Sequence, residues 1–155
     1  MQGISPPGKQ AFHNFVDYQQ RRAWGEDLCE ILLQPILPTG QKSPAFHIVC
    51  KPNGTITFER KVSEQDPASP WAAVYGAEIR YAVNTTPSTW NGEVAIPWPL
   101  LLGKSAEPPR LMRFNFSQHQ ANTGQSASWA GPIDFGRDDS FMGLLMLRES
   151  TDPAR

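Results

Sequence analysis

The stretch AWGEDLCEILLQP, residues 23–35, contains a strand-like apolar run, LCEILL, that carries one carboxylate, Glu30, in its middle. Burying an ionised group is costly unless the group finds partners. Three environments would explain this residue. Glu30 faces solvent from a bent strand, or it pairs with a basic residue such as Arg22 or Lys51, or it binds a ligand.

Short strand-like segments follow along the rest of the sequence. The 15 prolines and 12 glycines are typical of many short strands joined by turns rather than of long helices. Strands are predicted within residues 11–19, 27–35, 44–54, 55–61, 75–84, 88–102, 110–119 and 140–149. The polar segments 62–70 and 120–132 are predicted loops. With about eight or nine strands, the sequence predicts an all-β fold, an antiparallel β-sandwich that resembles a jelly roll.

One hairpin is predicted at the level of residues. If the second and third predicted strands pair about a turn at Thr39-Gly40, Cys29 falls opposite Cys50, close enough for side-chain contact. Two cysteines are too few for a disulfide scaffold. We therefore favour two small buried hydrophobic side chains over a disulfide at this pair.

Length and charge limit the classes of function. At 155 residues the chain is most simply one domain, with a β-sandwich at 11–150 between a flexible leader at 1–10 and a tail at 151–155. A net charge of −1 gives no general attraction to nucleic acid, and no apolar run approaches the roughly 18 residues of a membrane span. The first ten residues lack the apolar core of a signal peptide, so either the protein stays inside the cell or its true start lies upstream.

The tryptophans are candidate ligand contacts. Trp24 precedes Gly25-Glu26-Asp27 at the end of a predicted loop and is either a core plug or an exposed platform. Trp129 lies in a polar segment with almost no apolar neighbours, which favours a surface role. Trp90 and Trp98 flank an apolar strand, and we expect both in the core.

Catalytic and metal-binding patterns are weak in this sequence. Glu26 and Asp27 are adjacent and point to opposite faces of a strand, whereas a glycosidase needs two convergent carboxyls. The three histidines have no zinc-type spacing. Asp134, Asp138 and Asp139 are oxygen ligands of the type that calcium takes, although such a run is more often a solvated turn. We predict a noncatalytic protein that requires no cofactor.

Six pieces of the sequence, taken in order, carry a family resemblance. They are WGEDLCEILLQP (24–35), AFHIVCKPNG (45–54), STWNGEVAIPWPLLL (88–102), RFNFSQHQ (113–120), SASWAGP (126–132) and DDSFMGLLML (138–147). In this order they resemble the family 9 carbohydrate-binding modules and their DOMON-like relatives. The EVAIPW segment is the most specific piece, and the resemblance covers about residues 20–148.

The resemblance implies a β-sandwich that binds an oligo- or polysaccharide, often at the reducing end of a glycan chain, between two tryptophan rings. The glutamate of the family would accept hydrogen bonds from sugar hydroxyls. In this sequence the implied carbohydrate-binding residues are Trp24, Glu30, Lys51, Asn53, Asn115 and Trp129. Members often carry structural calcium, for which Asp138 and Asp139 are the candidate ligands. The family also implies an extracellular or periplasmic location and attachment to a longer parent protein.

The sequence departs from the family pattern in three places. Ser117 and Ser126 stand where sugar-binding members tend to carry larger amide side chains, which predicts weaker binding. The final strand has Phe141-Met142-Gly143 in place of Phe-Gly. The N-terminal region is short by several strands, which predicts a sandwich that lacks N-terminal strands of the family.

Two other functions stay open at this point. A haem-binding sandwich of the DOMON type would take a methionine and a histidine as axial ligands. The available residues are Met112, Met142 and Met146 with His47 or His119, in no recognisable spacing. Alternatively, the domain is a structural or interaction module without a small ligand, and its tryptophans belong to the core.

Overall fold

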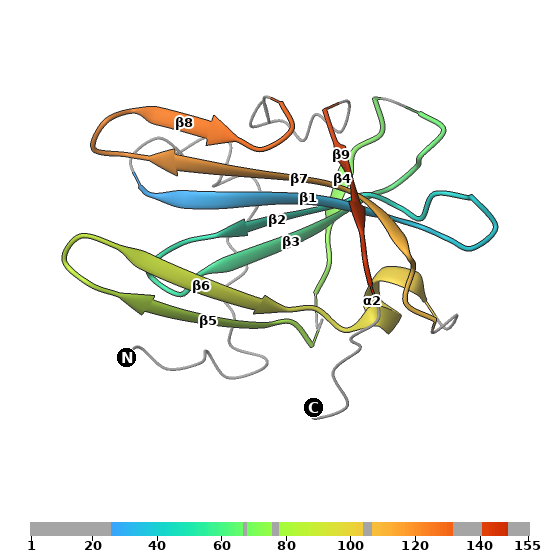
Figure 1. Cartoon of the computed structure of the whole chain (residues 1–155), viewed down its shortest axis with the longest axis horizontal. Coiled ribbons are helices and arrows are strands. Elements are labelled where there is room, and N and C mark those ends of the chain that lie inside the picture. Colours follow the sequence, from blue (N-terminus) through green and yellow to red (C-terminus); the bar gives the residue numbers. More distant parts are fainter. Residues whose placement is uncertain (1–25, 67, 76–77, 104–106, 132–140, 149–155) are drawn as a thin grey trace.

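The computed structural model describes residues 26–66, 68–75, 78–103, 107–131 and 141–148. In these residues the protein is all-β and antiparallel, with a seven-stranded sheet and a separate two-stranded hairpin (Figure 1). The predicted sandwich-like fold is thereby confirmed. The predicted strand at 11–19, the leader and the tail lie outside the described residues.

The seven-stranded sheet is built around its longest strand. Its members are β1 (Leu28–Ile36), β2 (Phe46–Cys50), β3 (Ile56–Lys61), β4 (Trp71–Ala73), β7 (Leu111–Gln120), β8 (Gln125–Ser128) and β9 (Gly143–Met146). Their order across the sheet is β4-β3-β2-β1-β7-β8, and β9 also pairs with β7. One edge of β7 pairs with the whole of β1, whereas β8 and β9 share the other edge.

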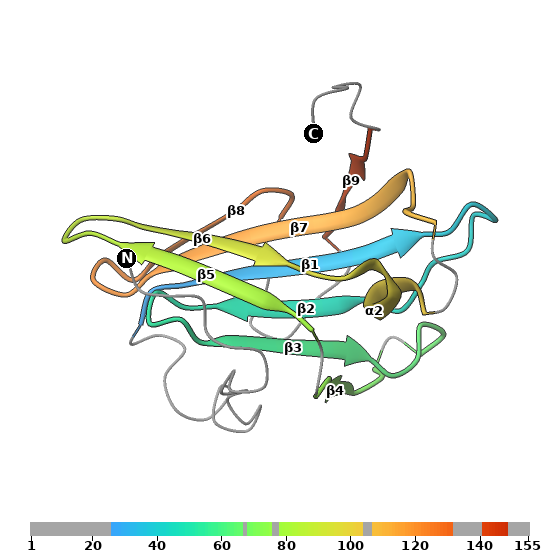
Figure 2. The same cartoon turned by 90° about the horizontal axis from the view of Figure 1, so that it is seen from below.

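A hairpin of β5 (Arg80–Thr85) and β6 (Trp90–Ala95) crosses in front of the sheet in Figure 2, and the short helix α2 (Trp98–Leu102) follows it. Strand side chains alternate between the two faces of a sheet, so every second residue of β1, β2 and β3 points toward this hairpin. We call this side of the sheet the core face. The hydrophobic core there comprises Leu33, Phe46, Ile48, Cys50, Ile56, Phe58, Ile79, Tyr81, Val83, Leu101 and Met112.

The opposite side of the sheet is also buried, but many of its side chains are polar. The buried polar and charged residues that alternate with the core-face positions are Glu30, Gln34, His47, Thr57, Glu59, Lys61, Asn115, Ser117 and His119. We call this side the polar face. Buried polar groups need hydrogen-bond partners, so the partners on this face decide whether it is stable.

The hairpin predicted at the level of residues is confirmed. Cys29 is the register partner of Cys50 in the β1–β2 pair, and both cysteines are free thiols. Gly40 lies in the turn with a φ of 82°, a conformation that glycine adopts without strain. Its N–H donates to the Leu37 carbonyl oxygen at 2.8 Å.

Two strands were not expected from the sequence. β8 falls within 120–132, where a loop is predicted, and that prediction is wrong for Gln125–Ser128. The sequence of β8, QSAS, has no apolar alternation, because all four of its residues face solvent. Pairing with β7 holds the strand in place. β4 has only three residues, too few for a periodic pattern.

Candidate functional site

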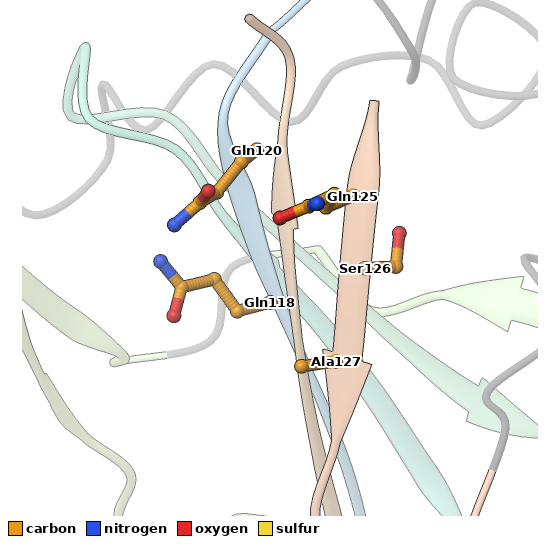
Figure 3. Close-up of a pocket in the computed structure, with 5 residues that line it drawn as sticks. All are labelled: Gln118, Gln120, Gln125, Ser126 and Ala127. Carbon is orange, nitrogen blue, oxygen red and sulfur yellow. The ribbon is translucent and has the colours of Figure 1, made fainter. Parts of the chain in front are cut away.

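A hollow of about 400 Å³ opens beside the β7–β8 hairpin. It is lined by Gln118, Gln120, Gln125, Ser126 and Ala127. Figure 3 shows the three glutamine amides on one side of the hairpin, whereas the Ser126 side chain points to the other side. Three flexible groups that can both donate and accept hydrogen bonds therefore converge on one space. We call this feature the glutamine hollow.

Strand register explains why these amides converge. Gln118 is paired with Ala127, and Gln120 with Gln125, across the β7–β8 ladder. Directly opposed residues project to the same face of a sheet. On its other edge Gln118 is paired with Cys29, which belongs to the core side of β1. The glutamine hollow therefore lies on the core-face side, where β7 changes from apolar to amide side chains.

Trp129 lies on the same side of the sheet, two residues beyond Ala127. Its backbone N–H donates to the Phe116 carbonyl oxygen at 2.8 Å. Its indole ring makes an edge contact with the Phe114 ring, with ring centroids 5.8 Å apart. The side chain keeps 56% of its surface exposed. The predicted surface role of Trp129 agrees with this exposure.

Asn115 fixes the segment that carries Trp129. Its side-chain amide donates to the carbonyl oxygens of Gly131 and Phe141 at 3.0 and 2.7 Å. Its Oδ1 accepts from the N–H groups of Phe116 and Ala130, both at 2.9 Å. With four bonds to backbone and no exposed surface, Asn115 is a structural residue in this conformation rather than a ligand contact.

A carboxylate–imidazole–carboxylate chain crosses the polar face. His47 Nε2 lies 3.2 Å from Glu30 Oε2, and His47 Nδ1 lies 3.3 Å from Glu59 Oε2. The three side chains come from the neighbouring strands β1, β2 and β3, and all three are buried. Trp71 on β4 places its ring edge-on to the imidazole, with centroids 6.1 Å apart.

The two carboxylates control the charge of His47. Burial by itself would lower the pKa of the imidazole, because it disfavours the charged form. Hydrogen bonds and Coulombic attraction from Glu30 and Glu59 act in the opposite direction and raise the pKa above its ordinary value. The raised pKa favours an imidazolium that donates from both ring nitrogens.

The structure separates two of the predicted carbohydrate-binding residues, Glu30 and Trp129. Glu30 is paired with Ser117 and Ser117 with Ser128, so these three residues share the polar face. Trp129 is the next residue along and contacts Phe114 on the core-face side. A single sugar therefore cannot contact both Glu30 and Trp129, because the sheet separates them.

The remaining predicted site residues have local roles or cannot be placed. Lys51 Nζ donates to Glu26 Oε2 at 2.6 Å, rather than to Glu30. Asn53 is exposed, and its Oδ1 accepts from the Thr55 N–H at 2.9 Å within the β2–β3 turn. The residues that lie outside the described part of the chain are Arg22, Trp24, Asp134, Asp138 and Asp139.

The candidate haem ligands are also divided between the two faces. Met112 belongs to the hydrophobic core, whereas His47 lies on the polar face with both ring nitrogens near carboxylates. Nδ1 of His119 lies 2.9 Å from the Ser126 hydroxyl. Met146 is exposed on the short strand β9. Met112 and His47 therefore lie on opposite faces of the sheet and do not form a pair of ligands for one iron.

Within the described residues, no group of three or more His, Cys, Asp and Glu side chains is arranged to hold a metal ion. No helix in the same part of the chain has the length and apolar character needed to cross a membrane. Comparisons with protein-family models, curated proteins and solved structures found no match to this chain. The family 9 resemblance therefore stays a prediction.

Two features of the site were missed at the level of sequence, although both left a signal. The predicted Cys29–Cys50 register already puts His47 diagonal to Glu30 on one face of the hairpin. The glutamines alternate in the sequence FSQHQ, and Gly124 with a φ of 64° marks a turn before Gln125. Recognising that turn would have predicted β8 and the convergence of the amides.

Proposed function

We propose that this protein is a noncatalytic carbohydrate-binding β-sandwich whose ligand site is the glutamine hollow, with Trp129 as an adjoining aromatic surface. The observation that carries the proposal is the convergence of the Gln118, Gln120 and Gln125 side chains on one open space. Each primary amide offers two donors and one acceptor with two lone pairs. Adjacent sugar hydroxyls, which both donate and accept, are matched partners for such groups.

Trp129 supplies the apolar part of the proposed recognition. A pyranose ring has apolar C–H faces and a polar rim, so it can stack on an exposed indole while its rim bonds to amides. Ala127 lines the hollow, and Trp129 follows it by two residues on the same side, a distance of about 7 Å at about 3.3 Å per strand residue. This spacing suits a ligand of more than one sugar unit.

The magnitudes predict weak binding. Stacking one sugar face on the indole removes about 40 Å² of apolar surface from water, which is worth about 1 kcal/mol at about 25 cal/mol per Å². Three neutral hydrogen bonds at about 1 kcal/mol each bring the sum to about 4 kcal/mol. That sum corresponds to a dissociation constant of about 1 mM. We therefore expect the natural ligand to be a polysaccharide, on which such weak contacts can be repeated.

The proposal keeps one part of the family resemblance and changes another. It retains Trp129 as an aromatic wall of the site and the oligo- or polysaccharide as ligand. It moves the polar contacts from Glu30 on the polar face to the three glutamines on the core-face side. Glu30 is 2% exposed and held by His47, so its surface is not offered to a sugar in this conformation.

The test is an NMR titration of the ¹⁵N-labelled protein with glucose, cellobiose and xylobiose. Side-chain amide signals of Gln118, Gln120 and Gln125 and the Trp129 indole signal are expected to shift in a saturable way. Replacement of Gln118 or Gln125 by Ala should weaken binding about fivefold per lost hydrogen bond of about 1 kcal/mol. Gln41→Ala is the matched control, because Gln41 is an exposed glutamine in the β1–β2 loop.

A structural or interaction module without a small ligand is the second candidate. It is favoured by three exposed apolar side chains on β7 and β9, namely Leu111, Leu144 and Met146. This function predicts no movement of the glutamine amide signals with any saccharide. A flat titration of the folded protein would therefore select it over carbohydrate binding.

A further inference from the structure

Two thiols face each other across neighbouring strands. Cys29 on β1 and Cys50 on β2 are register partners, and both lie on the core-face side. Both cysteines are free. They differ in access, because Cys29 is partly exposed whereas Cys50 keeps only 3% of its surface. One thiol of the pair is therefore reachable from solvent, and the other is buried beside it on the neighbouring strand.

Their backbone placement suits a covalent bond. Directly opposed residues in an antiparallel pair have Cα atoms about 4.5 or about 5.5 Å apart, depending on the hydrogen-bond pattern. A disulfide accepts Cα separations of about 4.4–6.8 Å. Both kinds of pair fall within this interval. The Cβ atoms of directly opposed residues lie about 4.5–5.5 Å apart, against about 3.5–4.5 Å across a disulfide, so bridging these cysteines requires side-chain rotation and a small approach of the two strands.

We propose that Cys29 and Cys50 are a redox modification site, at which the two thiols close to a cross-strand disulfide by exchange with a small disulfide such as oxidised glutathione. The Cys29 thiolate attacks one glutathione sulfur, forming a mixed disulfide and releasing the first glutathione thiolate. The Cys50 thiolate then attacks the Cys29 sulfur and releases the second. The protein loses two electrons and two protons, and oxidised glutathione becomes two molecules of reduced glutathione.

The surroundings of the pair make this exchange slow at neutral pH. Burial, together with the nearby carboxylates of Asp27 and Glu30, raises the pKa of Cys29 to about 11. Burial and the neighbouring Cys29 raise the pKa of Cys50 to about 12. The Tyr81 phenol from β5 also faces the thiols and has a raised pKa, mainly through burial, so it adds no charge. Because the thiolate is the nucleophile, the rate should rise about tenfold per pH unit below these values.

The experiment exposes the folded, reduced protein to oxidised glutathione at about pH 7 and about pH 9. The reaction is quenched with acid, and intact mass and non-reducing peptide maps are recorded. We expect a product that has lost two hydrogen atoms and a peptide pair joined through Cys29 and Cys50. The reaction at the higher pH should be about 100-fold faster, and dithiothreitol should restore the starting mass.

Two variants separate the two steps. Cys50→Ala should stop at a mixed disulfide between Cys29 and glutathione. Cys29→Ala should stay unmodified while folded, because Cys50 is buried. Backbone amide spectra establish that each variant is folded. The proposal is overturned if folded wild-type protein accumulates only mixed disulfides or linked dimers. It is equally overturned if folded protein stays unmodified at about pH 9 while urea-unfolded protein reacts.

Discussion

Glu30 Oε2 lies 3.2 Å from His47 Nε2 on the neighbouring strand, and both side chains are buried. This contact accounts for a carboxylate within an otherwise apolar strand. The imidazole continues the chain to Glu59 at 3.3 Å, so it lies between two carboxylates that favour its charged form. Buried charges persist when they are paired and hydrogen-bonded in this way.

The first prediction concerns the protonation of His47. Because Glu30 and Glu59 raise its pKa, the imidazole should titrate at a pH above about 6.5, the value of an unperturbed histidine. The measurement is the pH dependence of the ¹³C and ¹⁵N chemical shifts of the ring. Glu59→Gln should lower this pKa, because it removes one of the two carboxylates. A midpoint below about 6.5 in the wild type would contradict the structure.

The same shift predicts how stability depends on pH. A histidine whose pKa is raised on folding stabilises the folded state fully below its unfolded pKa of about 6.5. This contribution is lost as the pH rises through the folded-state pKa. Urea unfolding from about pH 6 to pH 9 should therefore show the wild type losing stability relative to His47→Gln. Equal pH profiles for the two proteins would count against a charged imidazole.

A second prediction separates a structural role of Glu30 from a role in ligand binding. Glu30→Leu leaves the buried His47 imidazole without one of its two carboxylate partners and should lower the free energy of unfolding by about 3 kcal/mol. The matched control is Glu26→Leu, which removes an exposed ion pair with Lys51 and should cost less than about 1 kcal/mol. Saccharide binding at the glutamine hollow should survive Glu30→Gln, and its loss would return Glu30 to the site.

The sequence was most informative where burial enforces a pattern. The alternation in TITFERK and RLMRFNFSQH predicted β3 and β7, and one turn glycine was enough to predict the Cys29–Cys50 register. A shift of one residue would exchange the two faces of β1, so the hydrophobic core allows only one register. These contacts depend on local spacing and on a single hairpin.

Sequence reasoning was least informative where a contact depends on distant strands or on exposed residues. β1 pairs with β7, which lies about 80 residues later in the chain, so the shared face of Glu30 and Ser117 could not be predicted from local spacing. β8 has no apolar residue larger than alanine and gave no strand signal. The placement of Trp129 on the side away from Glu30 follows from that unpredicted strand.

A third prediction concerns the support of Trp129. Asn115→Ala removes four hydrogen bonds to the backbone of 116, 130, 131 and 141. Because buried peptide groups would lose their partner, the cost should be about 3 kcal/mol in urea unfolding. Asn53→Ala, which removes one exposed turn bond, is the control and should cost less than about 1 kcal/mol. Similar costs for the two variants would refute the anchoring role of Asn115.

The last prediction uses the close contact between Trp129 and Gly143. A Cβ on Gly143 would lie 2.7 Å from Cζ3 of Trp129, so Gly143→Ala should push the indole away from β9. Because the ring is half-exposed and can move, the cost in stability should stay near 1 kcal/mol. Saccharide affinity should fall about fivefold if the displaced ring supplied about 1 kcal/mol of stacking. The double variant with Trp129→Ala is the control, since Gly143→Ala should have no further effect on affinity once the indole is gone. An equal additional loss in that background would show that Gly143 acts on the ligand site by a route other than Trp129.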